Sequence, residues 1–121
     1  MCGINGIFNL NGAALPDAEH LLQRMNDRIA HRGPDDQGKW VSRGKELAFG
    51  HRRLSIIDLS PSGHQPMTDE SGNAIVFNGE IYNYKEIKTQ TGNSNRYISD
   101  SDTEVLLQLY KKKKAWRFKR T

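Results

Sequence analysis

The sequence has little of what a disulfide-bonded or membrane-spanning protein needs. Its 121 residues include one cysteine, four prolines and 8% aromatic residues. A single cysteine cannot form an internal disulfide, so Cys2 is either an inert small residue or a reactive thiol. No apolar run approaches the roughly 18 residues that span a bilayer, and the first residues lack the basic start of a signal peptide. We therefore expect one domain, cytoplasmic and without a membrane span.

Basic charge is concentrated at the C-terminal end of the chain. Seven of the 18 Lys and Arg residues lie in residues 111–121, which contain no Asp or Glu. Residues 1–110 keep 11 basic against 14 acidic side chains, a formal charge of −3. The net charge of +4 thus comes from the last residues, and it is no reason to assign nucleic-acid binding to the rest.

Hydrophobic patterning predicts strands and helices mixed without strict alternation. Within residues 16–33, helical spacing places Leu21, Leu22, Met25 and Ile29 on one face. Strands are expected at residues 2–10, 39–42, 46–59, 73–84 and 96–99, helices at 16–33, 84–89 and from residue 101 onward, and a loop at 31–38. This order favours an α+β domain in which sheets pack against helices.

Cys2 is a candidate nucleophile because of its position. Aminopeptidases remove Met1 when a small residue follows, and Cys2 would then carry the α-amine. An α-amine with a reference pKa of about 7.7–8.0 can accept the proton of a thiol with a reference pKa of about 8.5. The alternative for Cys2 alone is a small residue near a frayed terminus.

Asn78 and Gly79 offer two donors for the oxyanion that forms when a thiol attacks an amide. These donors are the Asn78 side-chain NH2 and the Gly79 backbone N–H. The alternative is a two-residue hairpin turn between strands at residues 75–77 and 80–82. The two residues alone do not separate these interpretations.

Two charged residues allow a structural or a functional interpretation. Arg53 lies in an apolar run, so it should meet a carboxylate, either a protein group such as Asp58 or Glu80, or one on a ligand. Ser101 begins a Ser-Asp-Thr-Glu capping box, which places Asp102 in the first turn of a helix. The helix dipole favours a carboxylate there without any ligand.

Five stretches of the sequence carry a family resemblance. They are MCGI (1–4), HRGPDDQG (31–38), GHRRLSIIDLSPSGHQPM (50–67), FNGEIYNY (77–84) and SDSDTEVLL (99–107). In order and spacing they resemble the N-terminal glutaminase domain of glutamine-hydrolysing asparagine synthetases. This domain is a class II glutamine amidotransferase of the N-terminal nucleophile type. Other class II amidotransferases share the terminal cysteine and the Asn-Gly pair, whereas HRGPDD, RLSIID and NGEIYN resemble the asparagine synthetase branch.

The resemblance implies a role for each matched position. Cys2 would attack the side-chain amide of glutamine to give a γ-glutamyl thioester and ammonia, and water would then release glutamate. Asn78 and Gly79 match the oxyanion hole, and Arg53 matches the residue that binds the glutamine α-carboxylate. The other matched positions line the same pocket or hold the α-ammonium group: Leu54, Ser55, Ile56 and Ile57 for the pocket, and Glu80 and Asp102 for the ammonium.

The resemblance also implies parts that this sequence lacks. The family fold is a four-layer αββα sandwich, so we expect a sandwich that is incomplete at its C-terminal side, with uncovered apolar faces. ATP and Mg would bind a synthetase domain that is absent, and we expect no cofactor in this chain. The scattered histidines show no ligand spacing, so no metal site is expected. A complementing synthetase polypeptide or a homodimer is the expected partner, besides glutamine as substrate.

We predict that residues 1–110 form a partial class II amidotransferase domain and that residues 111–121 form a basic tail outside the family pattern. A reading-frame slip in the lysine tract would explain the tail. The alternative is an aromatic-interleaved tail that binds nucleic acid or an anionic surface, although short charge runs are usually solvated. Two functions stay open here. One is a glutaminase that supplies ammonia for ATP-dependent asparagine synthesis from aspartate, and the other is a catalytically inactive remnant or interaction fragment.

Overall fold

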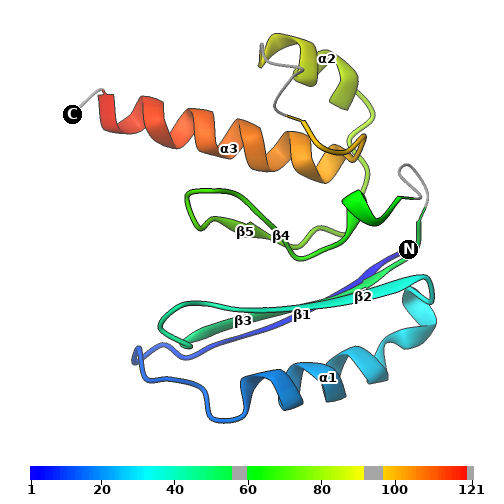
Figure 1. Ribbon diagram of the computed structural model, residues 1–121, viewed down its shortest axis with the longest axis vertical. Helices are drawn as coiled ribbons and strands as arrows, with labels where there is room; N and C mark the ends of the chain where they lie inside the picture. Colours follow the sequence, from blue (N-terminus) through cyan, green and yellow to red (C-terminus); the bar gives the residue numbers. More distant parts are fainter. Residues whose placement is uncertain (56–59, 92–96, 120–121) are drawn as a thin grey trace.

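Short antiparallel strands and helices follow one another irregularly along the chain (Figure 1). The computed structural model describes residues 1–55, 60–91 and 97–119, with the backbone alone for residues 114–119. The elements are β1 (Gly3–Phe8), α1 (Ala18–Arg28), the 3-10 helix η1 (Ala30–Arg32), β2 (Asp36–Val41), β3 (Leu47–Arg53), the 3-10 helix η2 (Pro61–Gly63), β4 (Met67–Thr68), β5 (Ala74–Ile75), α2 (Tyr84–Gln90) and α3 (Asp102–Lys119). The expected α+β class is confirmed, as are the helices that begin at Tyr84 and directly after Ser101.

The larger sheet is a three-stranded antiparallel sheet with β3 in the middle. Its register places Ile4 of β1 and Gly38 of β2 on either side of His51. Because side chains alternate along a strand, Ala48 lies on one face of the sheet while His51 and Arg53 lie on the other. The first face packs on α1, and the second face belongs to the site described below.

Helix α1 covers the first face of this sheet. Its Ala18 and Leu22 form a buried cluster with Ala48 of β3, and Leu22 is fully buried. The buried stripe continues to Asn26, four residues further along the helix. Leu21 is 38% exposed, so its predicted place on the buried face is wrong. The helix presents positions 18, 22 and 26 to the sheet, and this turns Leu21 toward solvent.

Buried Asn26 and half-buried Asn5 join α1 to both edge strands. Asn26 donates to the carbonyl oxygen of Gly38 at 3.1 Å and accepts a hydrogen bond from Asn5 Nδ2 at 2.8 Å. Gly50 of the central strand makes room for this pair, because a Cβ there would lie 2.3 Å from Asn5 Oδ1. A polar link thus crosses a face that apolar residues otherwise hold together.

The smaller sheet pairs β4 with β5, with Met67 opposite Ile75. Figure 1 shows this ribbon between the larger sheet and α3, with α2 beside α3 and α1 on the far side of the larger sheet. The turn between the two strands is held by Asp69, which accepts hydrogen bonds from the backbone N–H groups of Ser71 at 2.9 Å and Asn73 at 3.0 Å. No helix among the described residues has the length and apolar character to cross a membrane.

The strand expected at residues 39–42 is found as β2, but the expected loop boundary before it and two other strand predictions are wrong. Strand β2 begins at Asp36, inside the expected loop at residues 31–38, because Gly and Asp are tolerated where this edge strand pairs with β3. Strand β5 ends at Ile75, and residues 76–83 form no strand. Residues 97–99 form none either, because their backbone groups bond the side chain of Glu104 instead.

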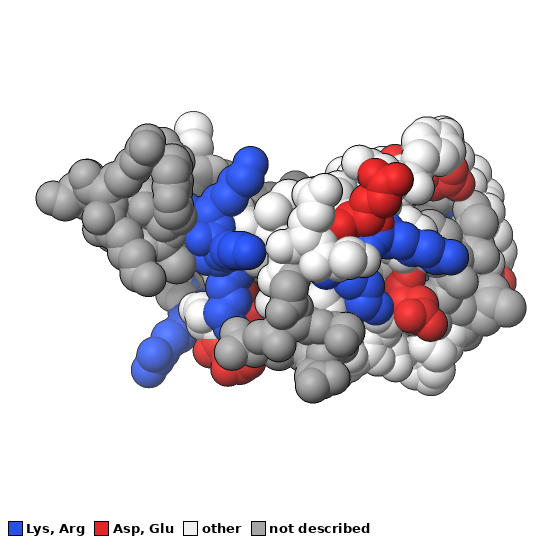
Figure 2. Space-filling model, turned by 90° about the horizontal axis from the view of Figure 1, so that it is seen from above, with Lys and Arg blue, Asp and Glu red and all other residues white. Residues whose placement is uncertain are grey.

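The face that α2 and α3 present carries charge of both signs (Figure 2). Figure 2 shows a band of Lys and Arg side chains in one part of this face, and acidic and basic groups mixed in another. Lys111, Lys112 and Lys113 belong to α3, which runs without a break past the boundary predicted at residue 110. Lys111 lies 3.9 Å from Glu70 of the β4–β5 turn, so the beginning of the lysine run contacts the body of the protein.

Candidate active site

A hollow on the face of the larger sheet away from α1 collects residues from separate stretches of the chain. It lies where the start of β1, the end of β3, the turn before β4, residues 77–80 and the first turn of α3 meet. The lining residues are Cys2, Arg53, Leu54, Gly63, Gln65, Phe77, Gly79, Glu80, Ser101, Asp102 and Thr103. Six of the residues singled out from the sequence are among them: Cys2, Arg53, Leu54, Gly79, Glu80 and Asp102.

The Cys2 thiol lies against the backbone that follows β3. The N–H of Leu54 donates to Cys2 Sγ at 3.3 Å, and Sγ lies 3.6 Å from the Leu54 carbonyl oxygen. Arg32 Nε donates to the carbonyl oxygen of Cys2 at 3.2 Å, which holds the backbone as well. The side chain is half-buried and lines the hollow, so the sulfur is fixed in place yet open to a ligand.

Arg53 at the end of β3 brings a positive charge to the hollow. It is 7% exposed, and its Nη1 donates to the carbonyl oxygen of Ser60 at 2.8 Å. Gly63 packs against the guanidinium, since a Cβ there would lie 2.3 Å from Nη2. Among the described residues, Glu80 included, no carboxylate is within ion-pair distance of Arg53. Asp58, the other expected partner, lies outside those residues. A buried guanidinium whose one side-chain hydrogen-bond partner among the described residues is a carbonyl is suited to a ligand carboxylate.

Asp102 brings a negative charge to the lining of the same hollow. It is 5% exposed, and its Oδ2 accepts a hydrogen bond from the Ile81 N–H at 2.9 Å. Ser101 caps the helix as predicted, because its hydroxyl accepts the Thr103 N–H at 3.1 Å. Asp102 is thus fixed by the start of α3 and holds the backbone after Glu80, whose exposed side chain also lines the hollow. The same carboxylate thus lies in the first turn of α3, as the structural interpretation requires, and lines the hollow, as the functional interpretation requires.

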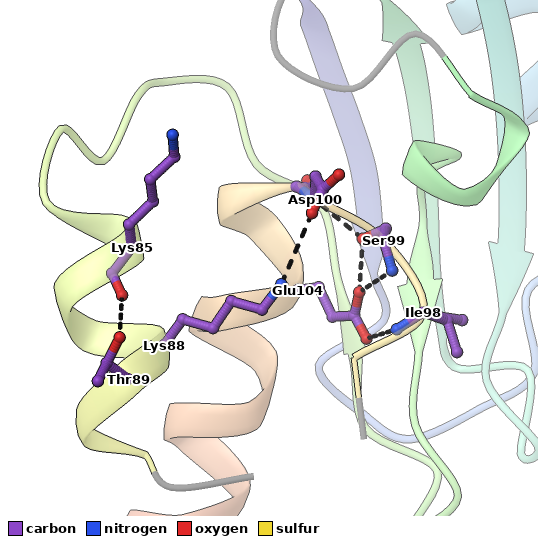
Figure 3. A network of polar contacts seen from close by, with 8 residues as sticks. Lys85, Lys88, Thr89, Ile98, Ser99, Asp100 and Glu104 are labelled. Atoms are coloured by element: carbon purple, nitrogen blue, oxygen red, sulfur yellow. Dashed lines mark hydrogen bonds and ion pairs between the residues drawn. The ribbon is translucent and has the colours of Figure 1, made fainter. Parts of the chain in front are cut away.

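A network of polar contacts supports the chain just before α3 (Figure 3). Glu104 accepts hydrogen bonds from the N–H groups of Ile98 at 3.0 Å and Ser99 at 2.8 Å, and from the Ser99 hydroxyl. Lys88 of α2 lies 3.7 Å from Asp100. The glutamate of the capping box therefore bonds the residues ahead of the serine cap, and the network anchors the turn that delivers Asp102 to the hollow.

Gly79 and Asn78 are placed differently. Gly79 is exposed and lines the hollow, whereas Asn78 is half-buried and does not line it. The hairpin interpretation of this pair is wrong, because β5 ends at Ile75 and no strand follows it before α2. The structure therefore supports a loop in which the Gly79 backbone is available to a ligand.

The segment after Arg53 lines the hollow only in part. Leu54 lines it, while the N–H of Ser55 donates to Asp35 Oδ2 at 2.8 Å. Ser55 borders a neighbouring hollow, which it shares with Arg53. Ile56 and Ile57, which the resemblance also assigned to the glutamine pocket, lie outside the described residues.

Gln65 is the most informative lining residue that sequence reasoning missed. It is 6% exposed, its Oε1 accepts the Phe77 N–H at 2.7 Å, and its Nε2 donates to Thr103 Oγ1 at 3.1 Å. It lies in the Gly- and Pro-containing stretch at residues 60–66, in which the sequence alone indicated no site residue. Gln65 lies within the family-like stretch at residues 50–67, and this is the sequence signal that could have identified it.

His51 borders this site from the middle of β3. It is fully buried, with Nε2 3.3 Å from the carbonyl oxygen of Phe77. Burial lowers the pKa of His51 below its ordinary value, although the contact with Phe77 acts in the opposite direction. A neutral ring that donates from Nε2 leaves Nδ1 as a bare acceptor, and Nδ1 has no partner among the described residues.

Comparison with known proteins identifies the family. The model of the glutamine amidotransferase domain matches residues 1–118. Glutamine-hydrolysing asparagine synthetase 1 of Bacillus subtilis is 45% identical over 114 residues, which cover 92% of this chain and 18% of that protein. Asparagine synthetase B of Escherichia coli is 35% identical over 114 residues, which cover 93% of this chain and 20% of that protein. Amidase chry2 of Gibberella zeae is 44% identical over 121 residues, with 92% and 18% covered.

These matches confirm the resemblance that the five sequence stretches indicated. Similar sequence is not confined to proteins named asparagine synthetase, as the amidase shows. The chain spans about a fifth of the length of the relatives it matches. It belongs to the family of glutamine amidotransferase domains.

Proposed function

We propose that this chain is a glutaminase module that hydrolyses glutamine to glutamate and ammonia at Cys2. The observation that carries the proposal is the meeting of the Cys2 thiol, the Arg53 guanidinium and the Asp102 carboxylate around one hollow. A free amino acid carries a carboxylate and an ammonium group, and the two charged side chains have the opposite signs. Arg53 binds the α-carboxylate, Glu80 and Asp102 hold the α-ammonium group, and Leu54 lines the pocket.

In this proposal Met1 is removed and the α-amine of Cys2 takes the thiol proton. The sulfur attacks the side-chain amide carbon of glutamine, and the resulting oxyanion receives hydrogen bonds from the Asn78 side chain and the Gly79 N–H. The C–N bond then breaks, ammonia leaves with the proton from the amine, and a γ-glutamyl thioester stays on the sulfur. Water hydrolyses the thioester to glutamate and restores the thiol, so this reaction requires no cofactor.

The names of the relatives indicate where the ammonia goes. Several are glutamine-hydrolysing asparagine synthetases, and this chain corresponds to a minor part of their length. We propose that the ammonia serves ATP-dependent asparagine synthesis from aspartate in a synthetase part that lies outside this sequence. The stacking of α1, the larger sheet, the β4–β5 ribbon and α3 supports an αββα sandwich of the N-terminal nucleophile type.

Exposed apolar side chains support the need for a further polypeptide in this proposal. Ile4 is 48% and Phe8 is 60% exposed, and the register of β1 places both on the sheet face that carries His51. A synthetase polypeptide or a second copy of this chain would cover this face. A molten, dye-binding state of the isolated chain would favour the alternative, a catalytically inactive fragment.

The first test measures glutamate and ammonia release by the purified chain, with mass spectrometry of its N-terminus. The Cys2→Ala variant is expected to lose activity completely, while the wild-type chain without Met1 is active. A wild-type chain with a free N-terminal Cys2 and no glutaminase activity would contradict the proposal.

A matched pair of arginine variants then tests the binding role. Arg53→Gln should raise KM for glutamine about 10–100-fold, because a charge-assisted hydrogen bond contributes about 1.5–3 kcal/mol. Arg52→Gln is the control, since Arg52 donates to the carbonyl oxygen of Gly33 at 2.9 Å and does not line the hollow. Equal effects of the two variants on KM would contradict the assignment of Arg53.

A further inference from the structure

The backbone of Phe77, the residue before Asn78 and Gly79, is held from both sides by buried polar side chains. Gln65 Oε1 accepts its N–H at 2.7 Å, and His51 Nε2 lies 3.3 Å from its carbonyl oxygen. Gln65 is 6% exposed and His51 is fully buried. These contacts replace the strand pairing that the chain loses when β5 ends at Ile75.

The same glutamine also contacts the first turn of α3. Its Nε2 donates to Thr103 Oγ1 at 3.1 Å, and Thr103 is 2% exposed and follows Asp102 directly. One side-chain amide therefore links the residue before the Asn78-Gly79 pair to the helix turn that carries Asp102. Both its nitrogen and its oxygen hold a partner within the protein, so Gln65 is built into the scaffold of the site.

His51 adds a contact of fixed direction. The carbonyl oxygen of Phe77 can only accept, so His51 must donate from Nε2. Burial lowers the pKa of His51, which favours a neutral ring that carries its proton on Nε2. The ring comes from the central strand of the larger sheet, and it ties the loop to a strand that is paired on both sides.

We propose that Gln65 and His51 are positioning residues that set the place of the Gly79 N–H and the Asn78 amide through the backbone of Phe77. This role rests on the proposed glutaminase function. Gln65 also sets the distance between these donors and Asp102 through Thr103. We call the two contacts of Gln65 and His51 with the Phe77 backbone the clamp. Misplacing a catalytic group by about 1 Å costs about 100-fold in rate, so loss of either Gln65 or His51 should lower kcat.

The test compares Gln65→Met with Gln65→Glu. Methionine keeps the length of the side chain and removes both hydrogen bonds, so kcat should fall about 100-fold with little change in KM. Glutamate keeps an acceptor for the Phe77 N–H and can accept from the Thr103 hydroxyl, so it should restore kcat at least about tenfold over the Met variant. Gln90→Met on the exposed part of α2 is the control, and it should leave kcat unchanged.

Amide hydrogen exchange at Phe77 measures the clamp without relying on turnover. In the wild-type chain this amide should exchange slowly, and Gln65→Met should accelerate it at least about tenfold. His51→Leu, which removes the contact to the Phe77 carbonyl, should also lower kcat while KM changes little.

The outcomes separate the clamp from the proposed function. An active wild-type chain whose kcat and Phe77 exchange are unchanged by Gln65→Met would overturn the clamp and leave the glutaminase function standing. A wild-type chain without turnover would overturn the glutaminase function, and the exchange rate would then decide whether the clamp exists. Equal loss of kcat in the Met and Glu variants, with both chains folded, would also overturn the role of the hydrogen bonds.

Discussion

Adding one methyl group at Gly63 should move the proposed carboxylate-binding group while the fold stays intact. A Cβ at this position would lie 2.3 Å from Nη2 and 2.8 Å from Cζ of Arg53, closer than atoms can approach. These atoms form the end of a flexible side chain, so the guanidinium moves and the backbone does not have to. Gly63 is not among the glycines with positive φ, so alanine can adopt its conformation.

The size of the effect follows from the contacts of Arg53. Displacing the guanidinium weakens its hydrogen bond to Ser60 and the proposed contact to the ligand carboxylate. A hydrogen bond to a charged group contributes about 1.5–3 kcal/mol, which corresponds to a KM increase of about 10–100-fold. Replacing a glycine by alanine restricts the unfolded chain and contributes about 0.4–1 kcal/mol of stability, which offsets part of the rearrangement. The free energy of unfolding should therefore change by no more than about 1 kcal/mol.

Steady-state glutaminase kinetics and urea unfolding of Gly63→Ala measure the two quantities separately. Ser62→Ala is the control, because Ser62 is an exposed neighbour in the same 3-10 helix. We expect a raised KM and a nearly unchanged kcat for Gly63→Ala, and neither change for Ser62→Ala. An unchanged KM for glutamine in a folded Gly63→Ala variant would refute the placement of Arg53 in substrate binding.

Three further predictions concern stability. Leu22→Ala should lower the free energy of unfolding by about 2–5 kcal/mol in a denaturant titration, because Leu22 of α1 is fully buried against β3. Gly50→Ala should cost about 1–3 kcal/mol by forcing Asn5 and Asn26 apart, and double variants with Asn5→Ala should show non-additive effects. Burial lowers the pKa of folded His51 below its ordinary 6.5, so the unfolded chain binds more protons as the pH falls through 6.5. Stability should therefore decrease with falling pH, by at most about 1.4 kcal/mol per pH unit for this group. His51→Gln should flatten the pH dependence of stability, and an unchanged slope would contradict the attribution of this dependence to His51.

Local signals in the sequence were sufficient to predict where α2 and α3 begin. Ser101 has the right side chain and the right spacing to a glutamate, and it caps α3 as expected. The amphipathic helix predicted within residues 16–33 exists as α1, which is shorter and spans Ala18–Arg28. Its rotation about its axis depends on the glycine and alanine surface of β3 that it meets. Leu21 and Leu22 are equally apolar, so no local pattern could show that only Leu22 is buried.

The strand predictions failed where tertiary contacts replace local preference. The apolar run after Ile75 has strand propensity, yet the backbone of Phe77 bonds to Gln65 and His51 and not to a neighbouring strand. Gln65 comes from another part of the chain, so no window around Phe77 contains the reason. The candidate site was predictable chiefly through family-like stretches, because the convergence of Cys2 and Asp102 depends on packing that no periodicity encodes.

The residues that contact one another around the hollow are far apart in the sequence. Cys2 meets Leu54 at a separation of 52 residues, and Gln65 meets Thr103 at a separation of 38. Contacts of this kind form late in folding, because long loops must close first. On a translating ribosome Cys2 is synthesised at the outset, but its surroundings stay open until α3 has emerged. The thiol is therefore accessible to oxidants throughout synthesis, and newly made chains should be more sensitive to oxidation than folded ones.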